Sequence, residues 1–272
     1  MTQVKWLRFV RMPVLGRNMA CAIFMMAWPA LGAYSGTGMV DLVEASAGLA
    51  FSESEVGEAS AVARQHFLAD LDANAQRGCV LHCAQIARVW GRLLAVVQAQ
   101  QAHTQARPQL EIVRSSALDA ISFAQGSIVL SEAFVSRLEL EDAELAFVLA
   151  HEAAHILLQH ERQTLTSAMA LMPGPGPRSA TDCYAQIEQH YFQMDDYFAL
   201  IAQQTEFEAD ETGFNMAALA GFDPQRQMGF MRKLAHVTPG QSMLSSHPDA
   251  LARLERLQAL LPLAARLYGL DK

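Results

Sequence analysis

The stretch that decides the fold is AELAFVLAHEAAHILLQH, residues 143–160, an apolar run that carries HEAAH at residues 151–155. Glu141 and Asp142 come directly before the run and suit the positive N-terminal end of a helix dipole. Apolar residues occupy nearly every face except at the motif, so we expect a central, buried helix over residues 141–160. Two histidines and a glutamate in such a helix need a chemical reason.

The two histidines are one helical turn apart and therefore share one face of the helix. His151 and His155 can point both imidazoles at one metal ion. Glu152 lies about 100° around the helix, where a general base for a metal-activated water is expected. The alternative, a pair of hydrogen-bonded core histidines, leaves the Glu152 carboxylate in an apolar setting, which is costly unless it finds a partner. The spacing therefore predicts a zinc site.

A catalytic zinc needs a third protein ligand besides two histidines. One known layout places a histidine ten residues after the first, but Glu161 occupies that position. The segment TEFEAD, residues 205–210, instead offers Glu206 as the ligand. Asp210 follows one turn later on the same face, where it can accept a proton from a ligand histidine. The alternatives are a solvated acidic face and Glu208 as the ligand, although Glu208 points about 160° away from the shared face.

Composition and charge limit the class of protein. The chain has 272 residues, of which 51% are hydrophobic and 18% charged, which predicts a folded protein with a substantial core. The net charge is −8, and Lys and Arg do not cluster outside the N-terminus. Because a nucleic-acid ligand needs such a cluster to neutralise its phosphates, we expect no nucleic-acid partner.

The N-terminus differs in kind from the rest of the chain. A basic segment containing Lys5, Arg8 and Arg11 is followed by a short apolar stretch and then by small residues. This order is typical of a secretory signal peptide, which we assign to residues 1–33. The apolar stretch is short for a bilayer span of roughly 20 residues, and an uncleaved N-terminal anchor is the alternative. We therefore expect an exported, periplasmic protein.

The remaining elements predict an α+β domain that is predominantly helical, with a small sheet beside the HExxH helix. Apolar spacing indicates helices at 52–75 and 81–102, within an N-terminal helical segment of residues 50–108. Short β-type runs follow between residues 109 and 131. The strand at 126–131 either borders a cleft, where it could hold an extended substrate by β-addition, or packs in the core.

The rest of the pattern is helical. We expect a short helix over 132–140, a helix from about Tyr184 to 219 that breaks near Met194, and helices starting at Pro224 and Pro248. His160 is expected to cap the end of the motif helix. The segment PGPGPRS, residues 173–179, is either a surface connector or a flap over a cleft.

Three cysteines lie beyond the predicted signal peptide: Cys79, Cys83 and Cys183. Cys79 and Cys83 are four residues apart on an expected helix, where disulfide geometry is poor. A bond from Cys183 to one of them is one alternative, and buried free thiols are the other.

Taken together, HExxH and the downstream ExxAD at residues 206–210 resemble the HtpX-like and CAAX-prenyl-protease-like family of zinc metallopeptidases. The resemblance extends from Gln109 to about Leu260 and includes the His-Pro segment SSHPDALARLERL. Asp119-Ala120-Ile121 departs from the Asn-Ala-Phe that the family often has. The resemblance implies a zincin-like fold, a zinc metallopeptidase domain at residues 109–262, and membership of an exported, soluble branch.

The resemblance further implies an endopeptidase with one zinc ion on His151, His155 and Glu206, and with Glu152 as the base. The substrates it implies are unfolded or misassembled proteins of the bacterial cell envelope, and peripheral association with the membrane or with an envelope complex is compatible with it. The alternative is a zinc-binding chaperone or assembly factor whose peptidase site is normally latent. A purely structural zinc site is disfavoured, because such sites are usually rich in cysteine.

His247 lies in a polar loop, TPGQSMLSSHPD at residues 238–249, directly before an expected helix. As a catalytic residue it would stabilise the oxyanion of the transition state. Alternatively it would occupy the open position of the zinc and hold the enzyme latent. The third alternative is a histidine that bonds to the backbone at the helix entry.

Overall fold

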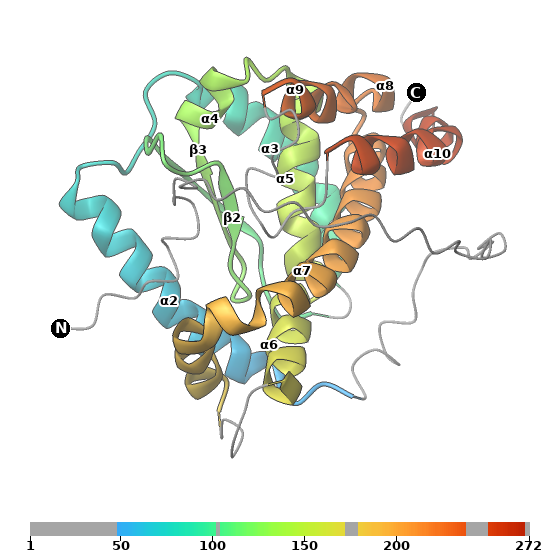
Figure 1. The fold of residues 1–272 in the computed structure, drawn as a ribbon. Helices are drawn as coiled ribbons and strands as arrows, with labels where there is room; N and C mark the ends of the chain where they lie inside the picture. The colour runs from blue at the N-terminus through green and yellow to red at the C-terminus, as the bar shows by residue number, and fades with distance from the viewer. Residues whose placement is uncertain (1–47, 102–103, 172–178, 238–249, 270–272) are drawn as a thin grey trace, which may run out of the picture.

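The computed structural model describes residues 48–101, 104–171, 179–237 and 250–269 (Figure 1). The predicted signal peptide at 1–33, residues 173–178 of the predicted connector, His247 and the helix start at Pro248 lie outside the described residues. The elements, in chain order, are α2 (Glu53–Ala73), α3 (Cys83–Ala99), β1 (Gln109–Val113), β2 (Ala120–Ser122), β3 (Ser127–Ser131), α4 (Glu132–Arg137), α5 (Asp142–Leu157), α6 (His160–Leu171), α7 (Ala180–Leu219), α8 (Pro224–Gln227), α9 (Gly229–Val237) and α10 (Ala250–Gly269). This confirms the predicted α+β class with a small sheet and many helices.

Helix α5 is the centre of the molecule. Almost all of its side chains are buried, because the apolar run leaves no polar face. At its N-terminus the amide of Glu141 donates to the Glu144 carboxylate at 2.8 Å, as expected for an acidic first turn. Helices α3 and α7 and the sheet pack around α5 (Figure 1). The HExxH motif is therefore held on the most enclosed helix of the fold.

The sheet has the strand order β1-β3-β2. Strand β1 runs parallel to β3, and β2 runs antiparallel to it. All five residues of β3 are buried and both of its edges are paired. The prediction that this strand could bind an extended substrate by β-addition was therefore wrong, and the core alternative holds. The strand next to α5 at the edge of the described sheet is β2.

Two predicted helix boundaries were wrong. The motif helix ends at Leu157, and Gln159 has φ of 56°, so the chain turns and a new helix begins at His160. His160 thus opens α6 and does not cap α5. The break predicted near Met194 is absent, since α7 is a single helix from Ala180 to Leu219. No proline or glycine occurs between residues 180 and 212 to interrupt it.

Cys79 and Cys83 form a disulfide with a Cα–Cα distance of 5.6 Å. The expectation of poor geometry was wrong because Cys79 precedes α3, which begins only at Cys83, so the two residues do not share a helix. Cys183 is a buried free thiol, and burial raises its pKa to about 11. None of the described helices has the length and apolarity that a membrane crossing requires.

Candidate metal centre

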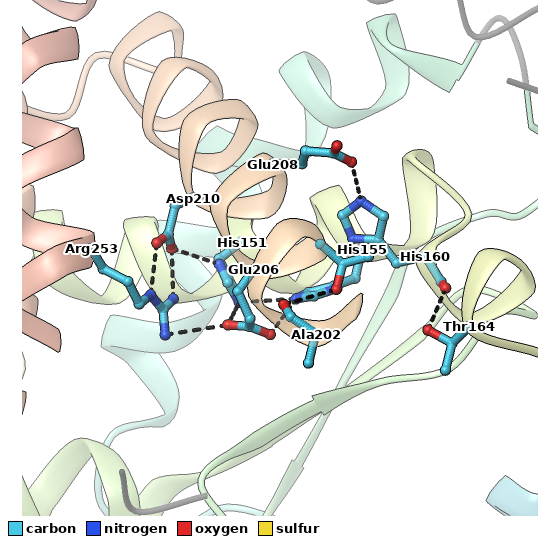
Figure 2. Close-up of polar contacts among 10 residues, drawn as sticks. His151, His155, His160, Thr164, Ala202, Glu206, Glu208, Asp210 and Arg253 are labelled. Atoms are coloured by element: carbon cyan, nitrogen blue, oxygen red, sulfur yellow. Dashed lines mark hydrogen bonds and ion pairs between the residues drawn. The ribbon is translucent and has the colours of Figure 1, made fainter. Parts of the chain in front are cut away.

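The candidate centre lies where α7 crosses α5 (Figure 2). His151 and His155 project from successive turns of α5, and Glu206 projects toward them from α7. His151 and Glu206 are buried, and His155 is half-buried. One ligand atom from each of these three residues lies within 4.8 Å of the other two. The structure thus brings together the three residues that the sequence analysis named as ligands.

The distances among the three ligand atoms suit a tetrahedral metal ion. The two histidine Nε2 atoms are 3.0 Å apart. The two Glu206 oxygens face different histidines, with Oε2 3.4 Å from His151 Nε2 and Oε1 3.3 Å from His155 Nε2. Zinc bonds of about 2.0–2.1 Å at tetrahedral angles place neighbouring ligand atoms about 3.3 Å apart. The donor set of two imidazoles and one carboxylate is also one that catalytic zinc sites use, so these residues fit the ion.

Asp210 holds His151 from the side opposite the candidate metal position. Its Oδ1 lies 3.0 Å from His151 Nδ1, so the Nδ1–H donates to the carboxylate and Nε2 keeps its lone pair for a metal. This is the role that the sequence analysis expected of Asp210. Burial by itself raises the pKa of Asp210, but the charge and hydrogen bonds of Arg253, together with His151, hold it below its ordinary value.

Arg253, from α10, is a residue of the site that the sequence analysis did not assign. Its Nε and Nη2 donate to the two Asp210 oxygens at 2.7 and 2.6 Å. Its Nη1 is 3.2 Å from the Glu206 carboxylate. Arg253 is buried and so links the ligand Glu206 to Asp210, as Figure 2 shows. The only sequence signal for it was an arginine following the His-Pro segment.

The electrostatics of the centre favour a positive charge between the ligands. Burial alone would lower the pKa of His151, but Glu206 and Asp210 outweigh burial and raise it to about 10. The two carboxylates therefore favour a positive charge at the position that His151 faces. A divalent cation would satisfy the same negative charge and also the two facing imidazole lone pairs.

His160 and Glu208 form a second chain of contacts behind His155. His160 Nδ1 lies 2.9 Å from His155 Nδ1, and His160 Nε2 lies 3.3 Å from the Glu208 carboxylate. Because Glu208 contacts His160, its carboxylate points away from the candidate metal position. The expectation that His160 caps the end of the motif helix was wrong, since His160 begins α6. The sequence signal for this pair was weak, because the turn at Gln159 decides where His160 points.

Glu152 is half-buried on α5. Burial lowers the pKa of the Arg253 guanidinium, but Asp210, Glu206 and, to the smallest extent, Glu152 raise it. Glu152 stands beside the histidine pair and is not one of the three clustered ligands. This placement is compatible with the predicted role of Glu152 as a base.

A histidine pair on one buried helix and a glutamate on a second helix are the arrangement of an HExxH…E metallopeptidase of zincin-like fold. The chain belongs to peptidase family M48, whose family model matches residues 83–261, more than half of the sequence. Members of this family are generally zinc-dependent metallopeptidases. The resemblance inferred from HExxH and ExxAD is thereby confirmed.

Curated relatives agree with this family. The chain is 30% identical to the beta-barrel assembly-enhancing protease of Yersinia pestis over 164 residues, which cover 53% of this chain and 32% of the relative. It is 25% identical to metalloprotease YcaL of Escherichia coli over 155 residues, 54% of this chain and 60% of the relative. It is 28% identical to mitochondrial metalloendopeptidase OMA1 of Saccharomyces cerevisiae over 137 residues, 47% of this chain and 39% of the relative. The chain spans about a third of the length of the Yersinia relative.

Proposed function

We propose that this chain is a zinc endopeptidase of the bacterial cell envelope that hydrolyses unfolded or misassembled proteins in quality control. The observation that carries the proposal is the convergence of His151, His155 and Glu206 around one position, with Glu152 beside it. The name of the Yersinia relative, a beta-barrel assembly-enhancing protease, supports the envelope setting. Protein substrates follow from the family.

The residues of the centre divide the chemistry of peptide hydrolysis among them. His151, His155 and Glu206 would hold a zinc ion, which would supply Lewis acidity for activating water and polarising the scissile carbonyl. Glu152 accepts the proton of the attacking water and delivers it to the leaving amine nitrogen. Asp210 keeps the His151 proton on Nδ1, and Arg253 holds both Asp210 and Glu206 in place.

The substrate backbone is proposed to lie along β2. This strand is at the edge of the described sheet and lies next to α5. An extended peptide that adds to the edge of β2 would present its backbone carbonyls near the HExxH motif of α5. Main-chain hydrogen bonds would fix the direction and the register of the added strand. Such binding depends little on side chains, which suits unfolded protein substrates.

The catalytic unit is proposed to comprise residues 109–262, with the helical segment 50–108 packed on it. Helix α3 of that segment shares the hydrophobic core of α5, through buried residues such as Ile86 and Leu93. The protein is proposed to be exported to the periplasm by the signal peptide at 1–33, with an N-terminal anchor as the alternative. N-terminal sequencing of the mature protein distinguishes these two outcomes.

The test is cleavage of unfolded casein by the wild-type protein and by Glu152→Gln, with the zinc content of both proteins measured. We expect about one zinc per chain in both proteins and cleavage only by the wild type, because the variant keeps the ligands and loses the base. Equal, metal-independent cleavage by both proteins would refute the mechanism. Zinc binding without cleavage by either protein would favour the latent chaperone or assembly factor.

The role of His247 is tested in the same assay. If His247 assists catalysis, His247→Ala loses cleavage and retains zinc. If His247 caps the metal, the same substitution raises the rate of cleavage. An unchanged rate would leave His247 with a structural role at the entry of α10.

A further inference from the structure

The two ligand histidines are supported from behind in different ways (Figure 2). His151 donates directly to a carboxylate, that of Asp210. His155 instead faces another imidazole, that of His160, with the two Nδ1 atoms 2.9 Å apart. The far nitrogen of His160 then meets the Glu208 carboxylate at 3.3 Å. One side chain, that of His160, therefore stands between His155 and the acid behind it.

His155, His160 and Glu208 form a chain of hydrogen bonds. If Glu208 is ionised and His160 is neutral, the protons of this chain have only one possible arrangement. The Glu208 carboxylate can only accept a hydrogen bond, so the facing His160 Nε2 must carry the proton. A neutral His160 then has its lone pair on Nδ1 and accepts from His155. His155 must accordingly carry its proton on Nδ1, which leaves the lone pair of its Nε2 directed at Glu206 and His151.

Metal coordination requires the same arrangement. A His155 that binds a metal through Nε2 carries its proton on Nδ1, and the facing Nδ1 of the buried His160 accepts that proton only with its lone pair free. Glu208 is itself oriented by Gln204, whose Nε2 donates to the other carboxylate oxygen at 2.9 Å. Glu208 at the outer end of the chain thus has both carboxylate oxygens in hydrogen-bond contacts.

We propose that Glu208, acting through His160, is a positioning residue that sets the tautomer of His155 and so prepares its Nε2 as a metal ligand. This inference rests on the proposed zinc site and adds two residues to it. If His160 carried its proton on Nδ1, it would donate to His155, and the His155 proton would move to Nε2. That proton would occupy the metal side of the ring and oppose coordination.

The first test measures zinc affinity by competition with a chelator. His160→Leu removes the acceptor for His155, and we expect affinity to fall roughly 10- to 100-fold, as is typical when a partner of a ligand histidine is lost. Glu208→Leu removes the acid alone and is expected to lower affinity roughly tenfold. Glu208→Gln keeps an oxygen that accepts from His160, so it is expected to restore most of the loss.

The matched control is Thr164→Val. The Thr164 hydroxyl donates to the backbone carbonyl of His160 at 2.9 Å, so this variant perturbs the same turn of α6 without touching the imidazole. We expect its zinc affinity to equal that of the wild type. Metal-free thermal unfolding of all four variants separates loss of folding from loss of the ligand. Glu208→Leu keeps the test valid if His160→Leu does not fold, since Glu208 lies at the surface end of the chain.

The second test reads the tautomers directly, by long-range proton–nitrogen NMR of ¹⁵N-histidine-labelled, zinc-loaded protein. We expect His160 to carry its proton on Nε2 and His155 to carry its proton on Nδ1. A His160 proton on Nδ1 would overturn the inference, as would zinc affinities of His160→Leu and Glu208→Leu equal to that of the wild type. A wild-type protein that binds no zinc would reject the metal site itself. Failure of the proposed zinc site is therefore distinguishable from failure of the inference about Glu208 and His160.

Discussion

Gly213 of α7 lies directly against the backbone of His151 on α5. A Cβ atom built on Gly213 would come within 2.7 Å of the His151 amide nitrogen and 2.8 Å of its Cα. Glu206 is seven residues before Gly213, two helical turns along the same face of α7. The close approach of the two helices at Gly213 therefore helps to set how far Glu206 stands from the histidine pair.

Gly213→Ala is expected to destabilise the protein and to weaken zinc binding. The atoms that the new methyl group would meet are backbone atoms, which do not rotate away, so α7 must move from α5. Overpacking of this kind costs about 1–3 kcal/mol. Urea unfolding measures the loss, and chelator competition measures zinc affinity.

Gly91→Ala on α3 is the matched control for Gly213→Ala. No atom lies within 4 Å of a Cβ built there, so the substitution should stabilise the helix by about 0.5–1 kcal/mol. Equal effects of the two substitutions would show that the contact with His151 has no consequence.

Arg253→Met is expected to be strongly destabilising. The substitution leaves Asp210 buried without the guanidinium that donates to both of its oxygens. Removing one partner of a buried ion pair costs about 3–5 kcal/mol. Arg253→Lys keeps the charge but cannot reproduce the paired geometry, so an intermediate loss is expected.

Arg88→Met provides the comparison at the surface. Arg88 also binds a carboxylate with two nitrogens, that of Asp142, but both side chains are exposed. An exposed pair contributes about 0–1 kcal/mol. Denaturant unfolding of the three variants checks the order of effects, and a loss at Arg88 as large as at Arg253 would contradict the role of burial.

Removal of zinc is expected to lower the unfolding temperature of the wild type and to leave that of Glu206→Gln unchanged. A ligand that binds only the folded state stabilises it by about 2.7 kcal/mol at a free concentration of 100 times Kd. Differential scanning calorimetry with added zinc and with a chelator measures the shift. An equal response of Glu206→Gln would place the stabilising zinc elsewhere.

Glu161 is expected to make stability fall as pH rises from about 4.5 to about 7. Burial raises its pKa to about 7, against the opposing hydrogen bonds from the Ala124 amide and Ser60. The folded protein therefore holds this proton up to about pH 7, whereas the unfolded chain releases it near pH 4.5. The stability that the proton contributes is complete below about pH 4.5 and is lost as pH approaches 7.

Glu161→Gln removes that titration, so its free energy of unfolding should vary less between pH 5 and pH 8 than that of the wild type. Urea unfolding at four pH values across this range measures the difference, with the exposed Glu58→Gln as a control for the loss of a charge. Parallel curves for wild type and Glu161→Gln would show that Glu161 does not titrate in this range.

Local patterns were sufficient for much of the fold. The helix that carries HExxH, the short strands after Gln109 and the early helices follow from apolar spacing, acidic first turns and β-type runs. Boundaries were less accurate where one residue decides the direction of the chain. Gln159, which has a positive φ, separates α5 from α6. Glutamine is not a typical turn residue, so the sequence contained no signal for this turn.

At the candidate metal centre, too, some features follow from local sequence patterns and others depend on tertiary contacts. The spacing within one helix places His151 and His155 on a common face, and the same rule places Glu206 and Asp210 together on another helix. That much is decided by helical geometry, which is local. Arg253 comes from a helix far along the chain, and no local pattern says which buried acid it will neutralise.

The sequence by itself determined which side chains are candidate metal ligands and which of them share a helical face. Only the tertiary structure decided how those faces meet, through the close packing of α7 on α5, and which partners stand behind each ligand. The physical reason is that residue spacing controls contacts within one helix. Contacts between helices depend on packing of side chains that are distant in the chain, and the tautomer of a buried histidine depends on the neighbours which that packing supplies.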